Sequence, residues 1–356
     1  MTGQVRLPET PAVLAVRRGV REWVAARGGP MPVVVGLSGG ADSLALVAAA
    51  VVEAGDVTAI VVDHRLQDGS GEVAGRAAEQ ARALGCVAVE VVAVEVGRDG
   101  GVEAAARVAR YAALESVRGE RPVLLGHTLD DQAETVLLGL ARGSGGRSIQ
   151  GMAAWNEPWG RPLLAVRRAQ TRQLCADLGI EPWEDPHNLD PAYTRVRVRT
   201  EVLPLLEDVL GGGVAQALAR TADQLRADGD VLDVLTADLL RAATVRDDGR
   251  RGSDRPAGTT GNRGSGPGDS DRPALSIEIL ATAAPALRRR TIRAWLADQG
   301  IGGVLNAHLQ AIDELVSNWR GQGGVAVAGG SRDHRLVVTR AHGTLTVRAQ
   351  PRNDAT

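Results

Sequence analysis

The sequence predicts an α/β fold, with a doubly wound parallel sheet followed by a mainly helical second domain. Short β-branched runs alternate with Ala-rich helical stretches over the first 141 residues. This rhythm is typical of a parallel sheet covered by helices on both faces. A glycine-rich loop directly follows the first apolar run. The length of 356 residues suits two domains better than one.

Four apolar runs are expected to form the strands of the sheet, at 33–37, 57–62, 87–96 and 122–126. The helices are expected between and after them, at 43–53, 72–84, 102–118 and 129–141. Ligands of such sheets bind beyond the carboxyl ends of the strands. The functional residues are therefore sought at those ends.

The second half of the chain is predicted to be helical around one unfolded segment. Helices are expected near 168–178, over 214–241 and within 275–319, with short β-like runs at 325–347. The segment 246–273 holds seven glycines, six arginines and five aspartates and is almost without apolar residues. Such a composition cannot form a core, so it predicts a disordered insertion. We divide the chain into a nucleotide-binding catalytic domain, 1–212, and a mainly helical domain, 213–356.

The composition excludes several classes of protein. All 41 basic residues are arginine, so a Walker-A lysine, a kinase lysine, a Schiff-base lysine and an SxxK pair are excluded. Phosphate charge must be met by arginine, backbone N–H groups or a metal ion. The two cysteines form no CxxC pair, which excludes a zinc knuckle by local spacing and fits a reducing cytoplasm.

The charge and hydropathy of the chain say less. The sequence contains neither the roughly 20-residue apolar run of a membrane span nor a signal-peptide pattern. The net charge is −2, but residues 275–356 hold ten arginines and six acidic residues, a balance of +4. That balance is a mild indication of a polyanionic partner.

The loop after the first strand has the features of a phosphate site. It consists of Ser38, Gly39, Gly40, Ala41, Asp42 and Ser43. Glycines lack a Cβ and let backbone amides approach an anion, and the next helix begins here with unpaired N–H groups. We expect Asp42 or Ser43 to cap that helix. A plain glycine turn is the alternative, but the whole SGGADS string favours a nest for pyrophosphate.

Two further motifs follow later strands. Asp63 and His64 end the second strand and are candidates to reach ATP, His64 more so than Asp63. Glu103, Arg107 and Arg110 recur at i, i+4 and i+7 and so share one helix face. A solvated stripe of ion pairs is the alternative for that face.

The segment after the fourth strand is the strongest of these motifs. His127, Asp131 and Glu134 share a helix face at i, i+4 and i+7. Asp130 and Asp131 are also suited to simple capping. Carboxylates beside a phosphate site are suited to Mg²⁺, and equally to the ammonium group of an amino-acid substrate; the sequence leaves both open.

Together these strings resemble the tRNA(Ile)-lysidine synthetase family of the ATP-pyrophosphatase (PP-loop) superfamily. The matching strings are SGGADS, VDHRL, EAAARVARY, GHTLDDQAET and LARGSG. The resemblance continues to about residue 210 through 161–164, 183–188, 193–199 and 203–206. Val196 stands where the family often has asparagine. The helical remainder resembles the tRNA-binding domain of the family only in pattern.

The resemblance implies a PP-loop sheet and a two-step reaction. ATP adenylates the 2-carbonyl oxygen of the wobble cytidine of tRNA(Ile) with a CAU anticodon, and free L-lysine then displaces AMP to form lysidine. The implied site is as follows. Catalytic residues are Asp42, Asp131, Glu134 and Arg107; residues for ATP are Ser38, Gly39, Gly40, Ala41, Asp42, Ser43, His64 and His127; and Asp42, Asp131 and Glu134 are candidate ligands of Mg²⁺.

Two arginine clusters are expected to bind tRNA phosphates. Arg195, Arg197 and Arg199 alternate along what we expect to be an extended run with one face. Arg288, Arg289 and Arg290 begin a distal helix. We expect a cytoplasmic enzyme without a membrane partner, and a homodimer is left open. The alternatives are a sulfur-inserting or amidating PP-loop enzyme, or a non-catalytic nucleotide sensor.

Overall fold

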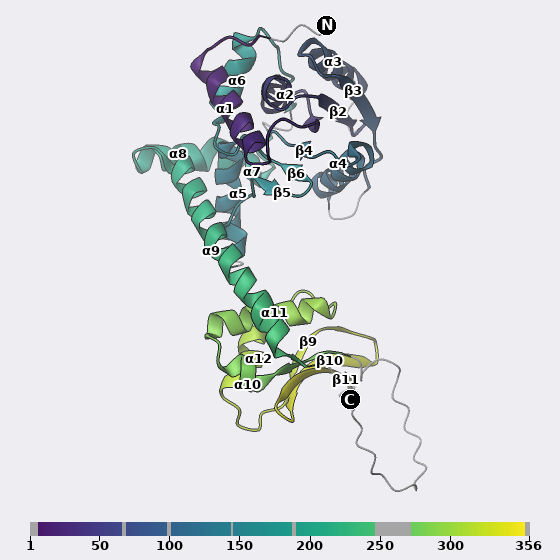
Figure 1. Cartoon of the computed structure of the whole chain (residues 1–356), viewed down its shortest axis with the longest axis vertical. Helices are drawn as coiled ribbons and strands as arrows, with labels where there is room; N and C mark the ends of the chain where they lie inside the picture. Colours follow the sequence, from purple (N-terminus) through teal and green to yellow (C-terminus); the bar gives the residue numbers. More distant parts are fainter. Residues whose placement is uncertain are drawn as a thin grey trace. The chain divides into compact units, whose positions relative to one another are not determined.

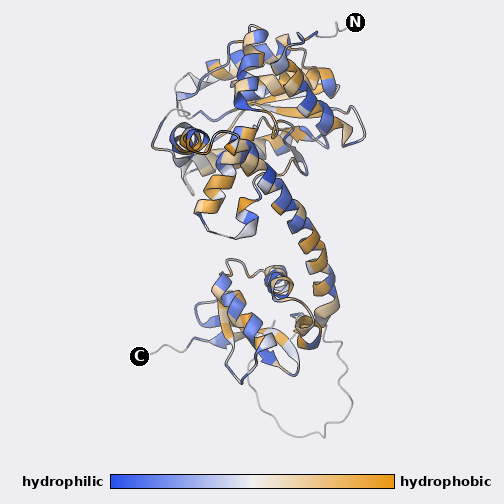
Figure 2. Cartoon of the chain, turned by 90° about the vertical axis from the view of Figure 1, so that its left-hand side faces the viewer, coloured by the Kyte–Doolittle hydropathy of each residue, from blue (hydrophilic) through white to orange (hydrophobic). Residues whose placement is uncertain are grey.

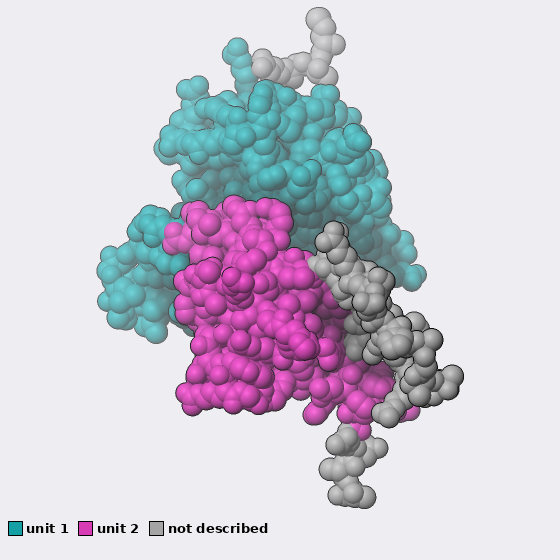
Figure 3. All heavy atoms as spheres, turned by 60° about the horizontal axis from the view of Figure 1, so that its bottom comes forward, with its two compact units in different colours: residues 1–226 teal, residues 227–356 magenta. Residues whose placement is uncertain are grey.

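The computed structural model describes residues 6–65, 69–97, 101–143, 145–186, 190–245 and 272–352. The chain divides into two compact units, Met1–Arg226 and Ala227–Thr356 (Figure 3). The division between the units falls inside helix α9 (Val214–Ala243), whereas our sequence boundary at 212/213 lies just before it. Nearly all of the predicted insertion, 246–273, lies outside the described residues.

The first unit contains a six-stranded, mostly parallel sheet with the order β3-β2-β1-β4-β6-β5 (Figure 1). Its strands are β1 (Val33–Leu37), β2 (Val57–Asp63), β3 (Ala88–Ala93), β4 (Val123–Leu124), β5 (Trp155–Asn156) and β6 (Trp159–Gly160). Only β5 runs antiparallel to its neighbour. The predicted α/β fold with a parallel sheet is thus confirmed. Figure 2 shows the apolar strands at the centre of this unit, with helices of mixed hydropathy around them.

Helices cover both faces of the sheet because alternate residues of its strands are apolar on each side. The helices of this unit are α1 (Pro11–Ala25), α2 (Ala41–Glu53), α3 (Ser70–Ala83), α4 (Val102–Arg118), α5 (Leu129–Ala141) and α6 (Arg168–Asp177). Val33 and Val35 pack with α1, α2, α3 and α6 on one face. Val34 and Ile60 pack with Leu114 of α4 on the other.

Helix α1 was not expected from the sequence. It begins at a Thr10 cap that accepts a hydrogen bond from the Val13 N–H. Its buried residues, Val13, Val16, Val20 and Trp23, follow helical spacing. They join the core against α2 and α6.

The extended run expected over residues 195–199 is helical in the structure, and that expectation was wrong. The segment consists of α7 (Thr194–Arg197) and a turn of π-helix (Val198–Val202), followed by α8 (Leu203–Val209). The alternation of arginine and valine is compatible with a strand, but in the helix Arg195 and Arg199 lie on one face, because they are four residues apart. The buried Glu134 lies opposite that face, so tertiary contacts override the local pattern.

The second unit is not mainly helical, which corrects the expectation from the sequence. Its helices α10 (Ile277–Ala281), α11 (Pro285–Asp298) and α12 (Asn306–Ser317) accompany a five-stranded antiparallel sheet with the order β7-β8-β11-β10-β9. The strands are β7 (Thr244–Val245), β8 (Ala274–Ser276), β9 (Val325–Gly330), β10 (His334–Ala341) and β11 (Thr344–Pro351). Val338, Leu345 and Val347 of this sheet pack with Ile292 and Trp295 of α11. Strands as short as β7 and β8 leave no readable pattern.

Among the described residues, no single helix is long and apolar enough to cross a membrane. The helix pair Thr194–Val209 and Val214–Ala243 meets the criteria of length and composition only when both parts are taken together across a 97° bend.

Candidate active site

The phosphate loop connects β1 to α2 and depends on its two glycines. Gly39 has a φ of +80°, and a Cβ there would lie 3.2 Å from the Cβ of Ala77. The Gly39 carbonyl accepts a hydrogen bond from the Trp183 N–H at 2.9 Å. Gly40 occupies the cap position of α2 without any side-chain cap. A side chain at position 39 would be strained, so the tight turn requires glycine there.

Neither Asp42 nor Ser43 caps α2, contrary to expectation. The Ser43 hydroxyl donates to the Gly40 carbonyl at 2.9 Å and accepts from the Ser38 N–H at 3.2 Å. The two serine hydroxyl oxygens are 3.2 Å apart. Ser43 therefore braces the loop from within, and the positive end of the α2 dipole faces the loop without a side-chain cap.

The segment that joins β4 to α5 lies directly against the phosphate loop. A Cβ at Gly126, after β4, would lie 3.0 Å from the carbonyl carbon and oxygen of Asp42. Thr128 caps α5, and Asp131 completes a capping box. The Asp131 Oδ2 accepts from the Thr128 N–H and hydroxyl, both at 2.8 Å. Asp131 is thus a capping residue through Oδ2, while its Oδ1 remains available to other groups.

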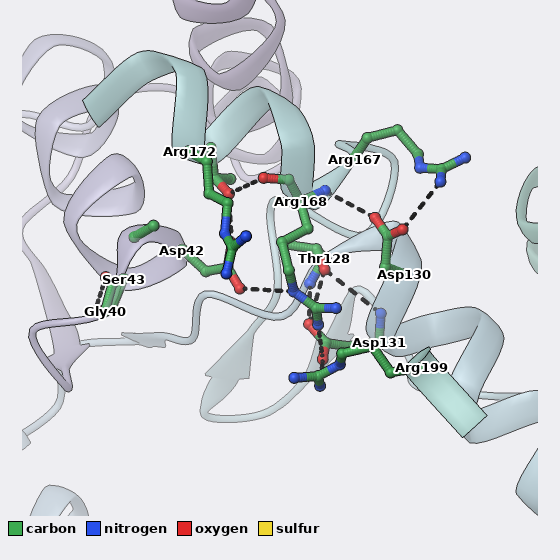
Figure 4. Close-up of polar contacts among 12 residues, drawn as sticks. Gly40, Asp42, Ser43, Thr128, Asp130, Asp131, Arg167, Arg168, Arg172 and Arg199 are labelled. Atoms are coloured by element: carbon green, nitrogen blue, oxygen red, sulfur yellow. Dashed lines mark hydrogen bonds and ion pairs between the residues drawn. The ribbon is translucent and has the colours of Figure 1, made fainter. Parts of the chain in front are cut away.

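The carboxylates of Asp42, Asp131 and Glu134 converge on the guanidinium of Arg168, the first residue of α6. Figure 4 shows Arg168 between Asp42 and Asp131. The nitrogen–oxygen distances are 3.4 Å for Asp42, 2.6 Å for Asp131 and 3.3 Å for Glu134. Glu134 is fully buried. The second oxygen of Asp42 accepts a hydrogen bond from the Thr171 hydroxyl, also on α6. The structure therefore brings together the three carboxylates selected from the sequence.

Two of the arginines expected to bind tRNA also face these carboxylates. Arg199 holds Glu134 with two hydrogen bonds, at 2.7 and 3.1 Å, and lies 3.5 Å from Asp131. Arg195 lies 3.4 Å from Glu134. Arg197 points elsewhere and pairs with the exposed Glu201. The three arginines therefore do not share one face.

Burial and charge shift the protonation of the site residues. Burial raises the pKa of Asp42, and Thr171 and Arg168 oppose this only in part. Burial also acts to raise the pKa of Asp131, but Arg168, Thr128 and His127 outweigh it, so this pKa is lowered. The two aspartates thus differ in acidity within one cluster.

Both candidate histidines are neutral at physiological pH. Burial lowers the pKa of His127 to about 4; the nearby Asp131 opposes this shift, while surrounding arginines add to it. Burial, together with the charge of Arg110, lowers the pKa of His64. The Nδ1 atom of each imidazole is buried without a hydrogen-bond partner among the described atoms.

Arg107 lies outside the carboxylate cluster. Its guanidinium lies 4.9 Å from the ring centre of Tyr111 and donates to the Tyr111 hydroxyl at 3.1 Å. Tyr111 packs edge-on against Trp159, with ring centres 4.5 Å apart. The charge of Arg107 nevertheless contributes to the low pKa of His127. The side chain of Glu103 lies outside the described part of the structure.

The distal arginine cluster separates into three different environments. Arg288 is buried and pairs with Asp313 through two nitrogens. Arg289 donates to the backbone carbonyl of Pro285, and Arg290 pairs with Asp233 at 2.9 Å. A shared phosphate-binding face is not formed by these three side chains.

The sequence analysis missed Arg168 and Thr171. They begin a helix that was expected, but their partners lie more than 30 residues away in the chain. The pair Arg167-Arg168 was the available signal, and nothing local shows which carboxylates it meets. Over the described ranges, no three or more Asp, Glu, His or Cys side chains are arranged to hold one metal ion; the three carboxylates share Arg168 instead.

Comparisons with known proteins show the family of the chain. The PP-loop domain family matches residues 16–206, and the TilS substrate binding domain matches residues 275–346. A tRNA(Ile)-lysidine synthase from Nocardia farcinica is 61% identical over 342 residues, which cover 96% of this chain and 99% of that protein. The enzyme of the same name from Rhodococcus jostii is 57% identical, with coverage of 96% and 97%. That from Mycobacterium tuberculosis is 53% identical, with coverage of 89% and 91%. The chain belongs to the tRNA(Ile)-lysidine synthase family.

Proposed function

We propose that the carboxylates of Asp42, Asp131 and Glu134, with the adjoining phosphate loop, form the centre at which this chain makes lysidine. As a member of its family, the chain is an ATP-dependent ligase that joins free L-lysine to the 2-carbon of the wobble cytidine of tRNA(Ile). One observation carries the placement. The carboxylates lie against the phosphate loop through the close contact of Gly126 with Asp42, so both half-reactions have their groups in one place.

The loop is suited to the pyrophosphate part of ATP. The absence of lysine from the chain leaves amides, arginines or a metal ion to meet the phosphate charge. The first-turn amides of α2 and the hydroxyls of Ser38 and Ser43 supply donors where the loop turns. We assign the β- and γ-phosphates to this loop, with the bond to the α-phosphate directed toward the carboxylates.

The carboxylates have two candidate cations, the lysine amine and Mg²⁺. Their chemistry fits Mg²⁺, which takes one or two protein carboxylates together with phosphates and waters, and Asp42 in the first turn of α2 is the nearest candidate. When bound, the ion would neutralise phosphate charge. Asp131 and Glu134 are the candidates to hold the lysine amine, because they are carboxylates three residues apart on α5 and therefore lie on one face of that helix.

The two neutral histidines are assigned to ATP. A neutral imidazole presents one N–H donor and one acceptor, so it suits a ribose hydroxyl or the adenine edge better than a phosphate. His64 directly follows β2, and His127 lies three residues after the end of β4. Both therefore lie at the carboxyl ends of strands, where ligands of such sheets bind.

The contacts with tRNA are proposed for exposed arginines. We keep Arg197 and Arg289 as candidates to bind tRNA phosphates. Arg197 lies on the surface, and the partner of Arg289 among the described residues is the backbone carbonyl of Pro285. Arg288 is not retained, because Asp313 already neutralises it inside the second unit. We assign Arg195 and Arg199 to the active centre, because both contact Glu134.

We also propose a cytoplasmic location. Cys86 and Cys175 are both free, and burial raises the pKa of each thiol to about 11, which suits a reducing compartment. A homodimer is likewise a proposal, and sedimentation of the purified chain would test it.

The experiment that tests the function is mass analysis of tRNA nucleosides. A tRNA(Ile) transcript with a CAU anticodon is incubated with the full chain, ATP, Mg²⁺ and lysine. We expect lysidine to replace the wobble cytidine only when ATP and lysine are both present. Nucleotide binding without tRNA-dependent release of pyrophosphate would instead indicate a sensor, and a sulfur-containing product would indicate a thiolase.

A further inference from the structure

Arg168 is the side chain shared by all three carboxylates of the cluster. Its Nε faces Asp42, its Nη2 faces Asp131 and its Nη1 faces Glu134. A guanidinium carries donors on three nitrogens in a fixed plane, so a single group sets the directions of all three contacts. The side chain is 16% exposed, and it is therefore largely shielded from competing water.

Each carboxylate also has an anchor of its own on its second oxygen. Thr171 holds Asp42, Thr128 holds Asp131, and Arg199 holds Glu134. Arg199 also lies 3.5 Å from Asp131, but none of these anchors joins Asp42 on α2 to the other two carboxylates on α5. Arg168 makes that link from a third helix, α6.

The start of α6 is itself fixed to α5. The backbone N–H of Arg168 donates to the Asp130 Oδ2 at 2.7 Å, and Arg167 pairs with the other oxygen of Asp130 at 3.1 Å. Asp130 thus places the base of the Arg168 side chain, while Asp131, its neighbour, receives the end of that side chain. The guanidinium is held at both ends.

We propose that Arg168 is a positioning residue for lysidine formation, which fixes the carboxylates of Asp42, Asp131 and Glu134 relative to one another before substrates bind. The inference rests on the proposed function of this centre. Arg168 acts through the carboxylates and does not touch the reacting atoms. A cationic reactant then meets oxygens already in place, and groups that need no reorganisation during the reaction stabilise its transition state best.

The test uses the full chain with Arg168→Met and Arg168→Lys and a matched control, Arg21→Met. Arg21 lies on α1 of the same unit and pairs with Glu53 through two nitrogens, at 2.7 and 2.9 Å, instead of with the three carboxylates. Lysidine formation is measured at saturating ATP and tRNA with lysine varied, which separates kcat from the KM for lysine. Thermal midpoints and active-site titration report the folded fraction.

We expect Arg168→Met to lower kcat by about 100-fold or more while the KM for lysine changes by less than about threefold. The reason is that the carboxylates that bind the amine remain but are misaligned. Arg168→Lys restores the positive charge but not the planar guanidinium with its three nitrogens. We therefore expect it to recover at least about tenfold of the lost kcat. Arg21→Met should stay within about threefold of the wild type in both constants.

Thr171→Val is a second probe in case Arg168→Met does not fold. It removes the hydroxyl that holds Asp42 and preserves the shape of the side chain, so kcat should fall about tenfold at constant KM. Wild-type kcat in folded Arg168→Met, a rise in KM alone, or an equal loss in Arg21→Met would each overturn the proposal. A failure of the proposed function would look different, because Glu134→Gln would then turn over like the wild type as well as Arg168→Met.

Discussion

Glu134 is the most deeply buried carboxylate of the active centre, and Glu134→Gln removes its charge with little change of shape. In the wild type, Glu134 accepts two hydrogen bonds from Arg199 at 2.7 and 3.1 Å. Arg168 and Arg195 lie at 3.3 and 3.4 Å. A neutral amide keeps one acceptor oxygen and turns an NH₂ group toward guanidinium donors. The variant therefore leaves positive charge without its partner.

The cost follows from the burial of the partners. Breaking a buried ion pair by removing one member costs about 3–5 kcal/mol. Asp131 still neutralises Arg168 and Arg199, and these side chains are 16% and 25% exposed, so we place the loss of stability at about 2–3 kcal/mol. For a unit of this size the thermal midpoint should fall by roughly 5–10 °C.

Turnover should suffer as well as stability. Loss of one charge that stabilises the transition state typically costs about 100- to 1,000-fold in kcat, and tRNA-dependent pyrophosphate release by the folded fraction measures it. Glu201→Gln is the matched control, since Glu201 forms an exposed pair with Arg197 on the neighbouring helix. It should leave both quantities unchanged. A wild-type thermal midpoint together with wild-type turnover in Glu134→Gln would refute the reasoning.

Four further outcomes are expected. Ser43→Ala removes the hydroxyl that braces the phosphate loop, so pyrophosphate release should fall about 10- to 100-fold at an unchanged thermal midpoint; normal release would contradict the loop assignment. The pKa of His127, about 4 in the folded chain, lies below the unfolded value of roughly 6.5, so stability should decline as the pH falls from 6.5 toward 4. Urea unfolding at pH 7 and pH 5 should show a smaller decline in His127→Gln, and an equal decline would exclude this histidine as a cause. Arg289→Ala should flatten the slope of log tRNA affinity against log salt by about 0.7–0.9. Arg288→Ala should instead destabilise the second unit without changing that slope. A flatter slope in Arg288→Ala and an unchanged slope in Arg289→Ala would place Arg288 on the tRNA-binding surface. Removal of residues 249–268 should leave turnover unchanged. Strands β7 and β8 are paired neighbours, and the eight residues left between them are enough for a hairpin connection. Loss of soluble protein would contradict this expectation.

Local signals in the sequence were sufficient to predict the strands and helices that position the candidate site. The predicted bounds of β1, α4 and α5 coincide with those of the structure. In each case a hydrophobic period is bounded by a strong stop, such as Gly119 after α4 or the capping Thr128 before α5. Asp131 and Glu134 at helical spacing after a strand likewise led us to expect that they lie near Asp42 of the glycine loop, and all three contact Arg168.

The other features of the structure depend on contacts between residues that are far apart in the sequence, and no local pattern predicts these contacts. Arg168 is 126 residues from Asp42, and no local period connects them. Residues 195–199 follow a strand-like alternation, yet the buried Glu134 holds Arg195 and Arg199 on one helical face. The second sheet is completed by two- and three-residue strands, which are too short to predict from propensity.

The proposed active centre is internally balanced in charge, and we expect this to affect how each substrate reaches it. Asp42, Asp131 and Glu134 are matched by Arg168, Arg195 and Arg199. Interleaved charges of opposite sign cancel beyond a few ångströms, so their field fades well within the Debye length of about 8 Å in physiological salt. We therefore expect free lysine to arrive by unguided diffusion and to be recognised only on contact. Its capture should be nearly indifferent to ionic strength, whereas that of a polyanion such as tRNA falls steeply with added salt, so a simple titration with salt separates the two encounters.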